Sequence, residues 1–294
     1  MLKLLWHNQD IMNRLDPTTR ASVLNCLIEG CSIRSTVSMT GVSKKAVSWL
    51  LVEAGAVAAD YMDRVMRNLP CNRIQVDELW GFNYCKARNV TPEIAAKVPG
   101  AGDMWLWVAF DADTKLVPCV LLGGRSASDA HEFVSDLASR LRGRVQMTSD
   151  GHRPYLEAVE GAFGADIDYA MLVKLYGQDP ENERRYSPAK CIGAIPTVVT
   201  GRPDPEHIST SFIERQNWTV RTTMRRYTRL SNGFSRKIEN HMAAVALNYF
   251  AYNFIKIHSS LRMTPAMAAG VVTRLFDVSD LVNLLIEAES KKAA

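Results

Sequence analysis

The hydrophobic pattern of the chain first changes its period near Pro70, and this change limits the folds that the chain can adopt. Before Pro70, apolar residues recur at helical spacing, and a first helix is predicted over residues 18–29 behind an Asp16-Pro17 start signal. After Pro70, short runs rich in β-branched and aromatic residues predict strands over residues 74–84, 104–110 and 116–122. The pattern therefore indicates a helical unit followed by an α/β unit.

The elements that follow continue the α/β pattern. A helix, a strand, a helix and a strand are predicted over residues 128–141, 145–148, 154–163 and 167–175. This order is similar to that of a ribonuclease-H-like domain, in which helices flank a mixed sheet. We expect a helical domain over residues 1–70, the α/β domain over 71–270 and a helical tail over 271–294. Within the second domain, the polar residues 178–207, punctuated by Pro and Gly, are predicted to be a loop or insertion.

The helical unit carries the pattern of a helix-turn-helix. Two short helices, capped by Ser32 and Ser43, are joined by a turn that contains Gly41. In that geometry the first turn of the second helix faces the bases and phosphates of DNA. The residues predicted to contact DNA there are Ser43, Lys44, Lys45 and Ser48. A three-helix packing module with a solvated lysine pair is the alternative.

Composition excludes some classes of protein but does not by itself identify the function. The 35 Lys and Arg residues exceed the 31 Asp and Glu residues by four, which is too few to indicate a nucleic-acid partner alone. No stretch approaches the roughly 18 to 20 apolar residues that span a membrane. The N-terminal residues reach His7 and Asp10 too soon for a signal peptide. We therefore expect a soluble cytoplasmic protein without a membrane partner.

Three acidic residues occupy positions that suit chemistry. Asp77 lies inside an apolar strand, Asp150 directly follows another strand, and Glu214 opens a helix. If the fold brings them together, their oxygens suit hard cations such as Mg²⁺ or Mn²⁺. Two such ions about 3.5 to 4 Å apart activate a water or 3′-hydroxyl for phosphoryl transfer. The alternative is that the three are unrelated surface acids.

The segment after Glu214 is strongly basic. Between Glu214 and Lys237 there are seven basic residues, and Glu214 is the only acid. A helix of this composition suits a DNA backbone next to a carboxylate-held metal, although an anion-rich protein partner would fit it too. The residues predicted to contact DNA here are Asn217, Arg221, Arg225, Arg226 and Arg229.

Three short motifs resemble those of a known family. They are Asp77-Glu78-Leu79-Trp80, Ser149-Asp150-Gly151-His152 and Phe212-Ile213-Glu214-Arg215-Gln216-Asn217. Together they resemble the acidic motifs of IS1-type insertion-sequence transposases, within the DDE transposase and integrase superfamily. The resemblance covers about residues 74–270 and implies that Asp77, Asp150 and Glu214 bind two Mg²⁺ or Mn²⁺ ions.

The resemblance also implies an activity and partners. It implies cleavage and strand transfer at the terminal inverted repeats of an insertion sequence, a double-stranded target DNA, and a homo-oligomer assembled on DNA in the bacterial nucleoid. Two features depart from the family. The chain lacks the cysteine spacing of an N-terminal zinc module, and 64 residues separate Asp150 from Glu214, which the 178–207 segment explains. A catalytically inactive DNA-binding regulator and a structure-specific nuclease are the alternative functions.

Overall fold

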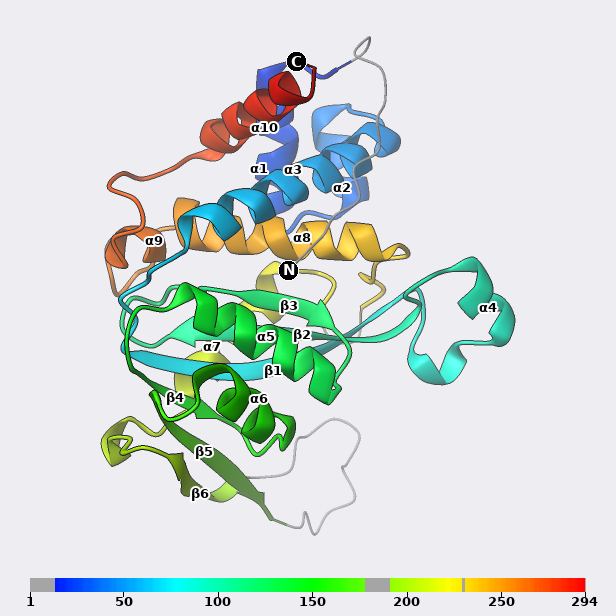
Figure 1. Cartoon of the computed structure of the whole chain (residues 1–294). Coiled ribbons are helices and arrows are strands. Elements are labelled where there is room, and N and C mark those ends of the chain that lie inside the picture. Colours follow the sequence, from blue (N-terminus) through cyan, green and yellow to red (C-terminus); the bar gives the residue numbers. More distant parts are fainter. Residues whose placement is uncertain (1–13, 178–190, 229–230, 294) are drawn as a thin grey trace.

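The computed structural model describes residues 14–177, 191–228 and 231–293 (Figure 1). Within these ranges, no helix has both the length and the apolar character that crossing a membrane requires. Three helices open the chain as predicted: α1 (Pro17–Ile28), α2 (Ile33–Thr40) and α3 (Lys44–Val65). Each begins at a side-chain cap, where Asp16, Ser32 and Ser43 accept hydrogen bonds from backbone N–H groups that the helix leaves unpaired. Local sequence thus sets where these helices begin.

A six-stranded mixed sheet forms the centre of the molecule. Its strands are β1 (Arg73–Asn83), β2 (Gly102–Asp111), β3 (Val120–Gly123), β4 (Val145–Ser149), β5 (Ile167–Tyr176) and β6 (Cys191–Thr200). They lie in the order β3-β2-β1-β4-β5-β6. β2 is antiparallel to both of its neighbours, β1 and β3. β4 is parallel to β1 and to β5, and β6 is antiparallel to β5. This mixed α/β architecture is consistent with the predicted ribonuclease-H-like class.

Helices cover both faces of the sheet. In Figure 1, α5 (Ala127–Arg140) and α6 (Pro154–Phe163) lie in front of it and α7 (Ser211–Thr223) lies behind it. The front layer packs on Trp107 of β2, whose ring contacts Phe133 of α5 and Tyr155 of α6 at centroid distances of 5.7 and 5.5 Å. Buried aromatic side chains therefore fix α5 and α6 against the strands that lead to the predicted acidic residues.

The helices after α7 pack the C-terminal part of the chain against its first helices. They are α8 (Ile238–Phe250), its π-helical continuation η4 (Ala251–Ile255), α9 (Pro265–Ala268) and α10 (Val278–Ala293). α3 packs along α8, and residues of α1, α3, the sheet, α8 and α10 belong to one hydrophobic core. The predicted domain boundaries at residues 70 and 270 therefore do not coincide with gaps in the core and remain sequence predictions.

The predicted loop over residues 178–207 is wrong in its second half. Residues 178–190 lie outside the described ranges, but Cys191–Thr200 form β6, paired with β5. Its β-branched residues favour a strand, and Pro196 is tolerated because β6 lies at the sheet edge, where one row of N–H groups needs no partner. An edge strand with Gly and Pro reads as a loop in sequence.

Two other predictions are corrected. The predicted loop after β1 contains η2 (Ala87–Asn89) and α4 (Pro92–Lys97), on the arm that projects from the sheet (Figure 1). The third strand begins at Val120 rather than at residue 116. The reason lies near Val117, whose N–H and C=O bond to the side-chain amide of Asn253 at 3.1 and 2.9 Å instead of extending the strand pairing.

The contact between α3 and α8 generates the first prediction. A Cβ at Gly55 would lie only 2.4 Å from the Cα of Ala243. We expect Gly55→Ala to lower the free energy of unfolding by about 1 to 3 kcal/mol, because rigid backbone cannot move aside cheaply. Gly161→Ala on α6 is the control, since its Cβ would meet only the His131 ring at 3.4 Å. Urea unfolding of both variants tests this, and equal stabilities would contradict it.

Candidate active site

The register of the sheet brings two of the predicted acids together. β4 pairs in parallel with residues 73–75 of β1, so the turn after β4 lies beside the next residues of β1. Asp150 lies in that turn, and Asp77 and Glu78 lie on β1. One carboxylate oxygen from each of these three residues lies within 4.8 Å of the others. We call Asp77, Glu78 and Asp150 the acid cluster.

Asp77 is held by α7 and by its own strand. Its carboxylate accepts hydrogen bonds from the Asn217 side-chain amide at 2.7 Å and from the backbone N–H of Glu78 at 2.8 Å. Burial raises the pKa of Asp77 to about 6, and the charges of Asp150 and Glu214 add to the rise. The carboxyl group of Asp77 is therefore half protonated near pH 6.

Glu78 is a member of the cluster that the sequence analysis did not assign. Its side chain is only 1% exposed, and one carboxylate oxygen pairs with the Arg125 guanidinium at 3.0 Å. The other oxygen, Oε1, is buried, and the buried Tyr155 hydroxyl is a hydrogen-bonding neighbour of Glu78 that lowers its pKa. Burial raises the pKa of Glu78 to about 7, with further contributions from Asp150 and Asp77. Adjacent strand residues normally face opposite ways, which is why the sequence pattern did not indicate this convergence.

The acid cluster fits a divalent cation. Three carboxylates this close repel one another, and the burial of Asp77 and Glu78 adds a desolvation cost. A hard cation offsets both, and carboxylate oxygens are the ligands that Mg²⁺ and Mn²⁺ prefer. Asp150 is further oriented by the backbone N–H of His152, which donates to it at 2.9 Å.

Glu214 lies near the cluster but does not join it. Its carboxylate pairs with Lys174 of β5 and accepts a hydrogen bond from the Thr210 hydroxyl at 2.5 Å. The side chain is 42% exposed, and its charge contributes to the raised pKa of Asp77. Lys174 is therefore a residue of the site that the sequence analysis missed, because β5 reads only as an apolar strand.

Gln75 fixes α7 against β1. Its side-chain carbonyl accepts hydrogen bonds from the backbone N–H groups of Phe212 and Ile213, both at 3.0 Å. These N–H groups belong to the first turn of α7, which has no partners for them within the helix. The strand that carries Asp77 therefore also caps the helix that carries Glu214.

The predicted DNA-contact residues near α7 divide into separate groups. Asn217 is buried and its amide donates to Asp77, so it belongs to the carboxylate network, and its contact with DNA remains a prediction. Arg221 lies on α7 with Glu214, whereas α7 ends at Thr223, before Arg225.

The next arginines contact protein groups. Arg225 is exposed and donates to the backbone carbonyl of Gly30 at 3.3 Å. Arg226 donates to the Ser235 hydroxyl at 2.6 Å, and burial lowers its pKa to about 10. Arg229 lies outside the described residues. The side chains of Arg225 and Arg226 are thus partly engaged in contacts within the protein, which the sequence does not indicate.

The predicted contacts in the N-terminal helices lie at the start of α3. Lys44 and Lys45 are exposed in its first turn, and Ser48 is half-buried. Ser43 uses its hydroxyl as the cap of α3, accepting from the Ala46 N–H at 3.3 Å. α2 and α3 are joined through Gly41, which adopts a left-handed conformation with φ of 70°. The two lysines are accessible, and their contact with DNA remains a prediction.

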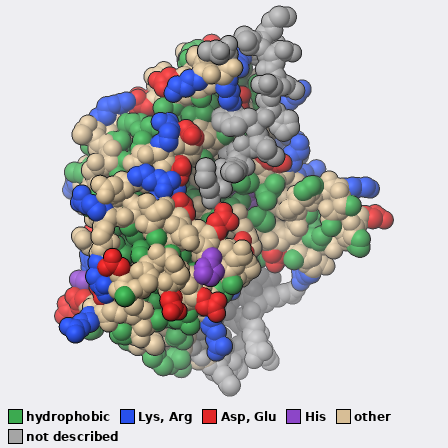
Figure 2. Space-filling view, in the orientation of Figure 1, with side chains coloured by type: hydrophobic (Ala, Val, Ile, Leu, Met, Phe, Trp, Pro, Cys, Tyr) green, Lys and Arg blue, Asp and Glu red, His purple; other side chains and the backbone are tan. Residues whose placement is uncertain are grey.

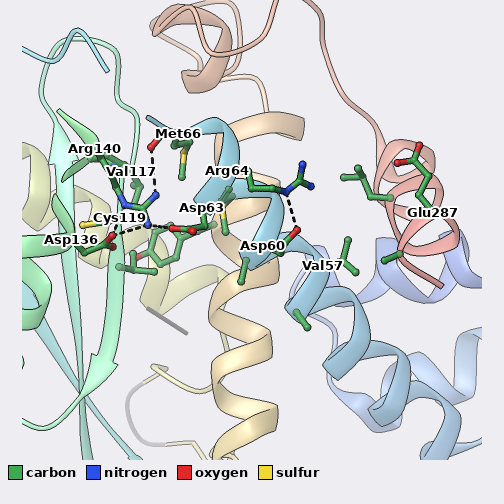
Figure 3. A pocket seen from close by; sticks show the side chains of 18 of the residues that line it. Val57, Asp60, Asp63, Arg64, Met66, Val117, Cys119, Asp136, Arg140 and Glu287 are labelled. Carbon is green, nitrogen blue, oxygen red and sulfur yellow. Dashed lines mark hydrogen bonds and ion pairs between the residues drawn. The ribbon is translucent and has the colours of Figure 1, made fainter. Parts of the chain in front are cut away.

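A cavity of about 630 Å³ lies elsewhere, between α3, α8, α10 and the β3–α5 side of the sheet. Figure 3 shows Arg140 inside it, with its guanidinium between Asp63 and Asp136 at 2.7 and 2.9 Å. Neither the acid cluster nor Glu214 lines this cavity. On the face in Figure 2, basic and acidic side chains intermingle, so the net charge of +4 forms no single patch there.

Comparisons with known proteins give weak similarities. No family model and no curated protein sequence matches the chain. The chain is similar to a piggyBac transposase in a synaptic complex with hairpin DNA, with 10% identity, a TM-score of 0.47 and coverage of 96% of this chain and 73% of that one. It is also similar to Mos1 transposase in a paired-end complex, with 14% identity, a TM-score of 0.19 and coverage of 53% of this chain and 60% of that one.

The raised pKa values predict a pH-dependent cation effect. Asp77 and Glu78, with pKa values of about 6 and 7, stay protonated in the folded protein at pH values where the unfolded chain releases both protons. Their contribution to stability therefore falls as the pH rises from about 4 to 7. Bound Mg²⁺ offsets this loss, and protons compete with it at low pH.

The measurement is thermal unfolding with and without Mg²⁺ at pH 8 and pH 5. We expect Mg²⁺ to raise the melting temperature by about 2 to 4 °C at the higher pH and by much less at the lower one. Asp150→Asn removes a ligand and abolishes the increase, whereas Asp166→Asn, at a side chain that is 86% exposed, keeps it. An equal increase in all three proteins would contradict a cation at the acid cluster.

Proposed function

We propose that this protein is a DDE transposase, which cleaves DNA at the ends of an insertion sequence and joins those ends to target DNA. The observation that carries the proposal is the convergence of Asp77, Glu78 and Asp150, with one carboxylate oxygen of each within 4.8 Å of the others. This convergence brings two of the three acids that resemble the IS1-type motifs into one group. A cation-binding carboxylate site on a mixed sheet suits phosphoryl transfer at a DNA backbone.

Asp77 and Asp150 are the residues that we assign to hold Mg²⁺ or Mn²⁺, with Glu214 completing a second site. When bound, the two ions supply an activated water or 3′-hydroxyl and stabilise the oxygen that leaves. Glu78 adds a third carboxylate at the first site. The chain's own residues orient these ligands: Asn217 fixes Asp77, and Lys174 holds Glu214 beside the cluster.

Recognition of the DNA is assigned to the basic residues outside the cluster. Lys44 and Lys45, exposed at the start of α3, are placed to meet a DNA groove or backbone if α2 and α3 act as a helix-turn-helix. Arg221 lies on the same face of α7 about two helical turns after Glu214, so it is assigned to the phosphates near the cluster. The partners proposed are terminal inverted repeats, target DNA and further copies of the chain assembled on the paired ends.

A DNA-binding regulator without catalysis is the second candidate. One observation favours it: Glu214 is neutralised by Lys174 and stands outside the acid cluster. A protein that had lost catalysis would keep its DNA-binding residues while the third acid served only in an ion pair. The two candidates differ in whether Mg²⁺ produces cleavage.

Asp150→Asn separates them. We expect the wild type with Mg²⁺ to nick and join a labelled fragment that carries the DNA ends flanking its own gene. Removing a group that only hydrogen-bonds to a metal ligand lowers activity roughly 10- to 100-fold. Because Asp150→Asn removes a ligand itself, we expect it to lower the cleavage activity by more than that. Its DNA affinity should remain within about twofold, since a single carboxylate contributes little to backbone binding.

Asp166→Asn is again the matched control, with full activity expected. Nicking and joining by wild type and control, both lost in Asp150→Asn, would establish the catalytic role of Asp150. Tight end binding without Mg²⁺-dependent cleavage by any of the three proteins would contradict the transposase and leave the regulator. Cleavage without joining would indicate a nuclease.

A further inference from the structure

The outer face of α7 carries large apolar rings that remain in water. Trp218 is 53% exposed and Phe212 is 40% exposed, although both lie on a helix that packs against the sheet. The opposite face of α7 buries Ile213, Asn217 and Val220. The exposed rings are therefore not needed to attach α7 to the protein.

Each ring is paired with a cation. The guanidinium carbon of Arg215 lies 4.3 Å from the centroid of the Trp218 ring, and the Lys115 ammonium lies 3.7 Å from that of Phe212. Phe212, Arg215 and Trp218 follow one another at three-residue intervals, so they form a continuous ridge along the helix. We call these three residues, together with Lys115 of the β2–β3 turn, the aromatic ridge.

The ridge lies next to the candidate active site. Trp218 follows Asn217, whose amide donates to Asp77 at 2.7 Å. It also lies four residues after Glu214, which places the two side chains on neighbouring positions of the same helix face. Trp218 is therefore one residue beyond the side chain that contacts Asp77 and one helical turn beyond Glu214.

We propose that the aromatic ridge binds an unpaired nucleotide of the DNA strand whose phosphodiester lies at the acid cluster; this rests on the proposed function. An aromatic ring stacks on any base whose face is free, and arginine stacks on a ring while it also bonds phosphate. The bases inside a duplex are already stacked on their neighbours and offer no free face. The ridge thus selects DNA ends that are frayed or carry a single-stranded extension.

The chemistry of the ridge favours nucleic acid over a protein partner. The ridge combines two cations with two rings, and an acidic peptide that reached from it to the acid cluster would be repelled by the carboxylates there. A nucleotide strand brings its own phosphates to Arg215 and Lys115 and its base to Trp218. The cations of the ridge then offset the phosphate charge near the cluster.

Binding without catalysis tests the proposal. The probe is a short fluorescent duplex in two forms, blunt or with about four unpaired thymidines at one 3′ end, titrated without divalent cation. The variants are Trp218→Ala, Trp218→Phe and Arg215→Ala. The control is Arg274→Ala, because Arg274 also stacks on a ring, Phe276 at 4.5 Å, but lies just before α10.

We expect the wild type to bind the extended duplex more tightly than the blunt one. Trp218→Ala should weaken binding of the extended duplex about tenfold and of the blunt duplex less than about twofold, whereas Trp218→Phe keeps most of the preference. Arg215→Ala should reduce affinity for the extended duplex more than Arg274→Ala does. With 2-aminopurine in the extension, fluorescence should be quenched by the wild type and not by Trp218→Ala.

Other outcomes overturn the inference in distinguishable ways. Equal binding of both duplexes by the wild type, or equal loss for both in Trp218→Ala, removes the ridge as a site for unpaired bases. If Mg²⁺-dependent cleavage is present in that case, the proposed transposase stands without the ridge. If the preference for the extension is present but cleavage is absent from the wild type, the ridge stands and the transposase fails.

Discussion

The attachment of α7 to β1 is the interaction on which the candidate site depends. Gln75 caps the first turn of α7 through two hydrogen bonds of 3.0 Å, and Asn217 returns a hydrogen bond of 2.7 Å to Asp77. Both strand residues point to the same side of β1, because they are two positions apart. The pair of contacts fixes the axis and the rotation of α7 and so decides where Glu214 and Trp218 lie relative to the acid cluster.

The acid cluster holds three carboxyl groups close together, which is electrostatically unfavourable when they are ionised. Burial and mutual repulsion raise the pKa values of Asp77 and Glu78 to about 6 and 7, and Arg125 offsets only part of this. The ammonium group of Lys174 forms an ion pair with the carboxylate of Glu214. A site that is strained in this way without a cation is well prepared to bind one, which is a common relation between local instability and function.

The helices at the start of the chain share the core of the sheet unit instead of forming a separate body. Gly55 lets α3 approach α8 closely, and Arg225 and Lys256 donate to the carbonyls of Gly30 and Ile28 near the end of α1. If α2 and α3 hold DNA, these contacts fix that DNA relative to the acid cluster. The arrangement therefore suits recognition and cleavage at a set separation along one DNA.

The sequence alone determined the parts that depend on neighbouring residues. Caps at Asp16, Ser32 and Ser43 and the change of period near Pro70 predicted the first helices and most strands, and Asp77 and Asp150 were two of the three acids that the sequence singled out. Only the tertiary structure decided that Glu78 joins them, that Glu214 pairs with Lys174, that Asn217 serves Asp77 and that Cys191–Thr200 is a strand. The physical reason is range: a cap or a helical period is set within a few residues, whereas these contacts depend on strand register and helix docking, which bring together residues far apart in the chain.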